Sequence, residues 1–197
     1  MKEQFEGLIQ SYIEQQVGID QEFLSERLAE GLLQHIRQLQ LLQLMKPAGI
    51  GNDLLKDPLQ QTRGDKIYWL DKSHDNPFEQ EFLLLMDSLI LYLNRTCYAG
   101  IQEYEFHFAV YEKGQAYHKH KDQFKNDDNR QFSLVCYLNK DWKEADGGQL
   151  WLHHADGIQK ISPEQQSAVF FKSDELEHEV RSSSRDRMSV TGWLKRG

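Results

Sequence analysis

The chain has 197 residues, of which 39% are hydrophobic and 27% charged, the balance of a folded domain with a real core. Its formal net charge of −8 argues against nucleic acid or an anionic membrane as the main partner, because both are negatively charged. The first residues do not resemble a signal peptide, and no apolar run approaches the ~20 residues of a membrane span. The two cysteines, Cys97 and Cys136, form no CxxC or disulfide framework, so we expect a cytoplasmic protein.

Three amphipathic helices are predicted in the first half of the chain, since apolar residues recur there at helical spacing. The three windows are 5–13, 23–39 and 78–94. Gly18 separates the first two, and Asp20 is the expected N-cap of the second. A short strand over 66–70 precedes the third helix.

The second half of the chain has the texture of strands. Residues 104–111 alternate with period two, as a half-buried strand does. Further strands are predicted at 132–138, 147–154, 167–171 and 187–194. Strands separated by turns favour a sandwich or barrel. We therefore expect an α+β chain that forms a single domain over 1–197, with helical support in 1–95 and the β core and site in 100–197.

Candidate metal ligands lie close together in AYHKHKDQF. On a strand, alternate side chains share a face, but three ligands in a row would span about 13 Å at ~3.3 Å per residue. A strand end that supplies His120 and Asp122 is therefore easier than one that also supplies His118. His178 alone would be read as a solvated turn residue. Two histidines and one carboxylate, however, match the facial triad of non-haem Fe(II) oxygenases, which leaves metal positions open for catalysis.

Arg187 follows His178 at the start of a predicted strand. Alternation places Arg187, Ser189, Thr191 and Trp193 on one face of that strand. An arginine that points into a β core needs an anion, because an unpaired buried charge is costly. The partner is either a protein carboxylate or a dicarboxylate ligand, which guanidinium can bind in bidentate fashion. Tyr137 could bind the same anion or be an ordinary core tyrosine.

Taken in order, these segments resemble the Fe(II)- and 2-oxoglutarate-dependent dioxygenases. The resemblance is to their prolyl 4-hydroxylase-like branch, and most of all to the hypoxia-inducible-factor prolyl hydroxylases and their bacterial relatives. It covers about residues 62–194. The matching segments are TRGDKIYWL (62–70), VYEKGQAYHKHKD (110–122), RQFSLVCYLNKDW (130–142), GGQLWL (147–152) and HEV through GWL (178–194).

The resemblance implies a double-stranded β-helix, a jelly-roll of cupin type, with the N-terminal helices packed on one sheet. It implies that Fe(II) is held by His120, Asp122 and His178, which are also the catalytic residues, and that His118 is not a ligand. The other implied roles fall on six residues. Arg187, Tyr137 and Thr191 would bind the distal carboxylate of 2-oxoglutarate, Tyr111 would lie near its iron-chelating end, and Arg130 and Trp193 would contact the substrate.

The implied reaction couples decarboxylation of 2-oxoglutarate to succinate with hydroxylation of a prolyl residue in a protein, and it consumes O2. Asp122 favours hydroxylation, because related halogenases lack this carboxylate. Ascorbate is a candidate reductant, elongation factor Tu the lead substrate, and oxygen sensing a candidate role. Substrate contacts are expected in the loop 124–130.

The chain departs from the animal enzymes in two places. The stretch from Tyr111 to His120 is one residue shorter, and the chain stops at Gly197 without their C-terminal helix, so target selection through that helix does not carry over. One alternative is an oxygenase that acts on a free amino acid or another small molecule. The other is a non-catalytic cupin-type protein that binds zinc or nickel without 2-oxoglutarate. The sequence predicts no oligomeric state.

The remaining histidines are given structural interpretations. His35 and His74 have no expected partners, and His153 and His154 are expected at an exposed strand end and turn. His107 lies on the face of its strand opposite its two phenylalanine neighbours and is expected to be partly buried.

Overall fold

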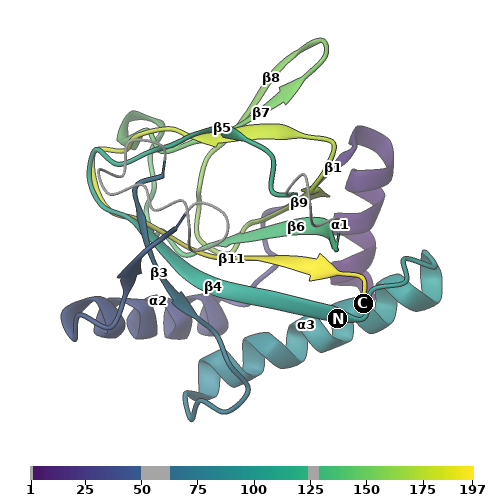
Figure 1. Ribbon diagram of the computed structural model, residues 1–197, viewed down its shortest axis with the longest axis horizontal. Helices are drawn as coiled ribbons and strands as arrows, with labels where there is room; N and C mark the ends of the chain where they lie inside the picture. The colour runs from purple at the N-terminus through teal and green to yellow at the C-terminus, as the bar shows by residue number, and fades with distance from the viewer. Residues whose placement is uncertain (1, 50–62, 124–128) are drawn as a thin grey trace.

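Three helices from the first half of the chain form one layer of the molecule (Figure 1). They are found in a computed structural model, which describes residues 2–49, 63–123 and 129–197. The helices are α1 (Lys2–Gln15), α2 (Glu26–Leu41) and α3 (Pro77–Thr96), and all three were predicted. Within the described residues, none of these helices is both long and apolar enough to cross a membrane.

The link between α1 and α2 differs from the prediction. Residues 17–20 form a strand, β1, and the N-cap of α2 is Ser25, whose hydroxyl accepts a hydrogen bond from the backbone N–H of Leu28 at 3.2 Å. Asp20 as the N-cap was therefore wrong. Gly18 does not simply break a helix, because a Cβ there would lie 2.5 Å from the carbonyl oxygen of Leu8. The glycine allows α1 to pack directly on β1.

Eleven strands in the described residues form two antiparallel sheets. The larger sheet has the order β1-β9-β6-β11-β4-β3-β2, and the smaller has the order β5-β10-β7-β8. The strands of the larger sheet are β1 (Val17–Asp20), β2 (Lys46–Pro47), β3 (Asp65–Trp69), β4 (Glu103–Tyr111), β6 (Arg130–Tyr137), β9 (Ala168–Lys172) and β11 (Arg187–Lys195). Those of the smaller sheet are β5 (Tyr117–His120), β7 (Leu150–His154), β8 (Gly157–Ile161) and β10 (Glu177–Val180), and a 3-10 turn, Glu144–Asp146, precedes β7.

The larger sheet is covered on both faces, and strand β4 shows how. Phe106, Phe108 and Val110 point outward into the core shared with the three helices. Ala109 and Tyr111 point the other way, into a second core against the smaller sheet. Burying a large apolar side chain contributes about 1.5–3 kcal/mol, so both layers are held mainly by such contacts. The predicted double-stranded β-helix with helices on one sheet is confirmed, and the polar site lies between the two sheets.

Candidate metal centre and anion pocket

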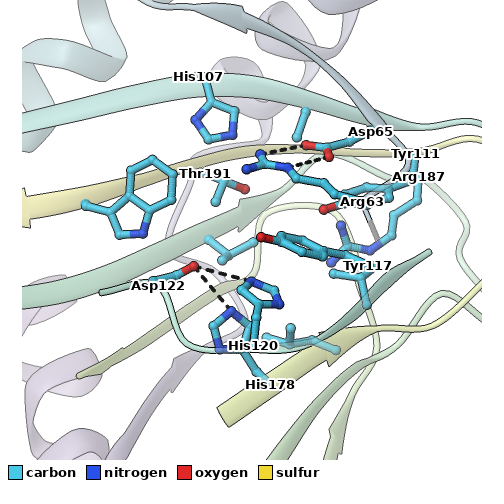
Figure 2. Close-up of a pocket in the computed structure, with 15 residues that line it drawn as sticks. Arg63, Asp65, His107, Tyr111, Tyr117, His120, Asp122, His178, Arg187 and Thr191 are labelled. Atoms are coloured by element: carbon cyan, nitrogen blue, oxygen red, sulfur yellow. Dashed lines mark hydrogen bonds and ion pairs between the residues drawn. The ribbon is translucent and has the colours of Figure 1, made fainter. Parts of the chain in front are cut away.

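Three predicted ligands meet at one edge of the space between the sheets. His120 ends β5, Asp122 lies two residues beyond it, and His178 lies on β10 directly opposite His120 in the strand register. Oδ1 of Asp122 is 3.5 Å from Nε2 of each histidine, and the ligand atoms all lie within 4.8 Å of one another (Figure 2). This cluster can hold a metal ion. His118 does not belong to it, and its ring is exposed.

Backbone carbonyl groups orient the two imidazole rings. Nδ1 of His120 is 2.7 Å from the carbonyl oxygen of His118, and Nδ1 of His178 is 3.1 Å from that of Leu176. A carbonyl oxygen only accepts hydrogen bonds, so each Nδ1 carries the proton. Each Nε2 therefore keeps a free lone pair that points toward Asp122, the tautomer that a metal requires.

The carboxylate of Asp122 is fixed from behind. Ser133 on β6 donates a hydrogen bond of 2.6 Å to Oδ2, and Ser173 lies 2.9 Å from the Ser133 hydroxyl. Both serines are fully buried. Because Oδ2 is occupied in this way, Oδ1 is the oxygen left for a metal ion.

The charges of the three groups depend on one another. Burial works against the carboxylate of Asp122, but His178 and His120 outweigh it and hold its pKa well below the usual range. Burial also works against a protonated His178, yet Asp122 raises its pKa overall. Burial lowers the pKa of His120. The pocket thus offers a permanent negative charge and two imidazoles to a cation.

Arg187 lies at the other end of the pocket and is only 2% exposed. Its Nε donates to the carbonyl oxygen of Gly148 at 3.0 Å, and its guanidinium lies 5.3 and 5.0 Å from the ring centroids of Tyr111 and Tyr137. No carboxylate of the described residues pairs with it. Gly148 has φ +67°, and a Cβ there would come within 3.0 Å of Trp142, so this position requires glycine.

The pocket between these two ends encloses about 470 Å³, including the part where it opens to solvent. Tyr117 stacks on His120 with 3.5 Å between ring centroids. Arg63 donates to both oxygens of the buried Asp65 at 2.7 and 3.0 Å. The pocket is lined by Arg63, Asp65, His107, Ala109, Tyr111, Tyr117, His120, Asp122, Val135, Leu150, His178, Val180, Arg187, Thr191 and Trp193.

The remaining predicted site residues occupy three kinds of place. Tyr111 and Thr191 line the pocket. Tyr137 lies behind Arg187, fully buried, and its hydroxyl has no hydrogen-bond partner among the described residues. Arg130 is not a lining residue but stacks on Trp193, with its guanidinium carbon 3.5 Å from the ring centroid. Of the predicted substrate loop, residues 124–128 lie outside the described residues.

Several residues around the pocket were not predicted to belong to it. Ser133 lies four residues before Tyr137 on the predicted strand 132–138, so alternation places both on one face, and this was the available signal. No such signal marked Tyr117, Arg63 and the buried Asp65. Pairing between separate strands places them, with Arg63 opposite Tyr117 and Asp65 opposite Tyr111.

Two interpretations of other histidines were wrong. His35 and His74 were expected to lack partners, yet both hydrogen-bond to the fully buried carboxylate of Glu79, at 3.3 and 2.7 Å. His153 and His154 do end a strand, β7, before a turn, as expected, but they are half-buried rather than exposed, and each contacts a neighbouring polar side chain. Cross-strand neighbours cover them, which a single strand pattern does not reveal.

The fold and the site together define a class of protein, and comparisons with known proteins agree. Residues 106–195 match the 2OG-Fe(II) oxygenase superfamily. A Pseudomonas putida prolyl-4-hydroxylase is 32% identical, superposes with a TM-score of 0.87, and the match covers 98% of this chain and 99% of that one. Human prolyl hydroxylase EGLN3 is 27% identical over 179 residues, 87% of this chain and 74% of the relative.

A third comparison supports the fold alone. A Trichoplax adhaerens prolyl hydroxylase, solved with a hypoxia-inducible-factor peptide, is 24% identical with a TM-score of 0.88 over 98% of this chain and 90% of that one.

The chain belongs to the 2OG-Fe(II) oxygenase superfamily. Within it, the chain is a dioxygenase of the prolyl 4-hydroxylase type, and the alternative of a non-catalytic cupin is set aside.

Proposed function

We propose that this enzyme hydroxylates a prolyl residue of a protein, with His120, Asp122 and His178 as the Fe(II) ligands and Arg187 as the anchor for 2-oxoglutarate. The observation that carries the proposal is the state of Arg187. It is buried, it has no carboxylate partner among the described residues, and it shares one pocket with the three ligands. A buried guanidinium in this situation needs an anionic ligand, and a dicarboxylate that also reaches the metal supplies one.

The residues present fit Fe(II) and 2-oxoglutarate. The donor set is two imidazole Nε2 atoms and one carboxylate oxygen, which leaves coordination positions open. When bound, iron and 2-oxoglutarate supply the oxidation, in which decarboxylation to succinate is coupled to transfer of one oxygen atom from O2 to substrate carbon. The protein fixes the ligands through Ser133 and two backbone carbonyls, and Arg187 orients the distal carboxylate.

Tyr137, Thr191 and Tyr111 are the proposed assistants in binding 2-oxoglutarate. The buried Tyr137 hydroxyl lacks a partner among the described residues, so a ligand oxygen near Arg187 would satisfy it. Thr191 lies four residues from Arg187 along β11, in the direction of the register position of Ser133. Tyr111 pairs directly with Arg187 in the sheet. O2 is the co-reactant, and ascorbate remains a predicted reductant.

Substrate binding is proposed at Arg130 and Trp193. Arg130 covers the Trp193 ring and also pairs with Glu105 at 2.7 Å, so the two form an ordered platform beside the pocket. The lead substrate is a proline of elongation factor Tu, which places the enzyme in the cytoplasm. Support comes from the chain's similarity to a bacterial protein named as a prolyl-4-hydroxylase. A role in oxygen sensing requires that the hydroxylation rate change with O2 concentration over the range found in the cell.

The first test of this proposal is anaerobic. Fe(II) followed by 2-oxoglutarate should give a visible metal-to-ligand charge-transfer band, which Asp122→Ala and Arg187→Ala should weaken or remove. With O2, purified elongation factor Tu should then gain one oxygen atom on a proline, detected by mass spectrometry, in step with succinate. Bound iron without the band would overturn the site assignment. A band and succinate without any hydroxylated protein would favour a small-molecule substrate.

A further inference from the structure

His107 on β4 is a buried histidine whose ring makes no hydrogen bond to any residue that the structure describes. Its side chain is 1% exposed, and its Nδ1 is one of the few buried polar atoms without a partner in the described part of the chain. It nevertheless lines the pocket, and Figure 2 shows its ring projecting from the strand into that space. Buried polar groups are normally hydrogen-bonded, so this ring calls for an explanation.

The surroundings of His107 are aromatic. Its ring centroid lies 4.9 Å from that of Trp69 and 5.4 Å from that of Trp193. The indole Nε1 of Trp193 is also buried without a partner among the described residues. Burial lowers the pKa of His107 to about 3, so the ring is neutral and keeps one N–H donor. Two residues that line this wall, His107 and Trp193, therefore each carry an N–H donor without a partner among the residues that the structure describes.

This wall borders the proposed 2-oxoglutarate site, since His107 is the direct register partner of Thr191, but it lies on the far side of β11 from β6. Arg187 and Thr191 lie on β11, and Ser133, which holds Asp122, lies on the neighbouring β6. His107 lies on the opposite side of β11, on β4, and its next register partner is Trp69 on β3. The Trp69 side chain is 46% exposed. His107 therefore lies between Thr191 on β11, on its inner side, and the exposed Trp69 on β3, on its outer side.

We propose that His107 donates a hydrogen bond to a backbone carbonyl oxygen next to the target proline and so positions the substrate over the metal ligands. This inference rests on the proposed function. A prolyl residue has no N–H, so the backbone around it offers a site mainly carbonyl oxygens. A wall of unpaired N–H donors beside aromatic rings complements such a segment, because the rings can pack on the pyrrolidine while the donors bind the carbonyls.

The test separates substrate binding from 2-oxoglutarate binding. His107→Phe keeps a planar ring and removes the donor, whereas His107→Gln keeps a donor. His154→Phe is the control, because His154 lies on β7 outside the pocket. The probe is the shortest proline-centred peptide that the wild type hydroxylates, taken from elongation factor Tu or from a peptide array. Its affinity for the Mn(II)- and 2-oxoglutarate-loaded protein is measured by fluorescence anisotropy, beside the charge-transfer titration of 2-oxoglutarate.

We expect His107→Phe to weaken peptide binding about 10-fold, since removing one partner of a buried hydrogen bond leaves the other unsatisfied. The 2-oxoglutarate affinity should change less than 2-fold, and His107→Gln should recover much of the peptide affinity. The control should match the wild type. The carbonyl groups that flank the proline are also replaced by thioamides, one at a time. At one position the thioamide should weaken binding to the wild type, and the same thioamide should not change binding to His107→Phe.

Other results overturn the inference. Unchanged peptide affinity in His107→Phe, an equal loss of 2-oxoglutarate affinity, or thioamide effects that are the same in both proteins would each exclude the carbonyl contact. If His107→Phe does not fold, His107→Leu, which also removes the donor, takes its place in the thioamide comparison. A wild type that turns over 2-oxoglutarate but hydroxylates no prolyl peptide would overturn the proposed function itself.

Discussion

The rings of His120 and His178 lie opposite each other on paired strands, with 4.3 Å between their centroids. The hydrogen-bonded register of β5 and β10 produces this closeness, so the two imidazoles are held in place by the backbone of the smaller sheet. Asp122 completes the cluster just beyond the end of β5. Ligands placed by a sheet need little rearrangement when a metal binds, which favours affinity.

Metal binding is expected to weaken as the pH falls. Asp122 raises the pKa of His178 against the opposing effect of burial, and the protonated ring cannot bind a metal. Below that raised pKa, one proton competes with the metal, so the dissociation constant for Mn(II) should rise about 10-fold per pH unit. Electron paramagnetic resonance titrations at pH 8, 7 and 6 measure it. His154→Gln should show the same slope, and a constant affinity over this range would contradict the prediction.

Ser133→Ala is expected to lower metal affinity about 10- to 100-fold, as loss of a group that orients a ligand commonly does. The substitution removes the 2.6 Å hydrogen bond to Asp122 Oδ2 and leaves the carboxylate free to turn. The measurement is Mn(II) binding by calorimetry. Ser184→Ala is the matched control, because Ser184 also contacts an aspartate, Asp146, but on an exposed loop. Equal affinities in the two variants would show that Ser133 does not orient Asp122.

Long periodic segments made much of this fold predictable. Alternation along 187–194 placed Arg187 and Thr191 on one face and Met188 and Val190 on the other. The structure agrees, with Met188 and Val190 in the core beneath the helices and Arg187 and Thr191 lining the pocket. Five short strands were not among those predicted, although a strand end was expected at His120: β1, β2, β5, β8 and β10. These strands have two to five residues, too few for alternation alone to mark them, and their pairing partners define them. The equally short β3, β7 and β9 were recognised because they contain aromatic residues typical of strands.

The site was predictable where spacing carried the signal. His120 and Asp122 share one strand end, and only the fold could bring His178 to them, so the resemblance was needed to complete the set. The hydrogen bond between His35 and Glu79 had no such signal, because it joins two helices far apart in the sequence. The unpartnered ring of His107 was equally hidden, since a strand pattern gives a residue's face but not its hydrogen bonds.

Arg187→Met is expected to abolish 2-oxoglutarate binding without destabilising the ligand-free protein by more than about 1 kcal/mol, because replacing a buried charge with an apolar side chain is often neutral. Thermal unfolding of the Mn(II)-loaded protein measures both effects. The wild type should gain about 2.7 kcal/mol at 2-oxoglutarate concentrations of about 100 times its dissociation constant, and the variant should gain nothing. Arg27→Met, at an exposed salt bridge, should respond like the wild type. A stabilised Arg187→Met would contradict the assignment.

Glu79→Gln is expected to destabilise the fold by about 1–3 kcal/mol, since it weakens hydrogen bonds to a buried group. The Glu79 carboxylate connects His35 on α2 with His74 and with the backbone N–H of Asp71, which is 2.8 Å away. Glu81→Gln is the control on the same helix. Its exposed pair with Arg27 should contribute about 0–1 kcal/mol. Urea unfolding at pH 7 gives both values.

The pH dependence of the Glu79 contribution follows from its pKa. Burial works against the carboxylate, but the hydrogen bonds from His35, Asp71 and His74 outweigh it and lower the pKa below its usual value. A lowered folded-state pKa means that the stabilisation is fully present above the unfolded pKa of ~4.3 and is lost as the pH falls through the folded value. The difference in unfolding free energy between the wild type and Glu79→Gln should therefore shrink below about pH 4. A difference that stayed constant from pH 7 to pH 3 would show that packing, rather than the charged hydrogen bonds, accounts for the role of Glu79.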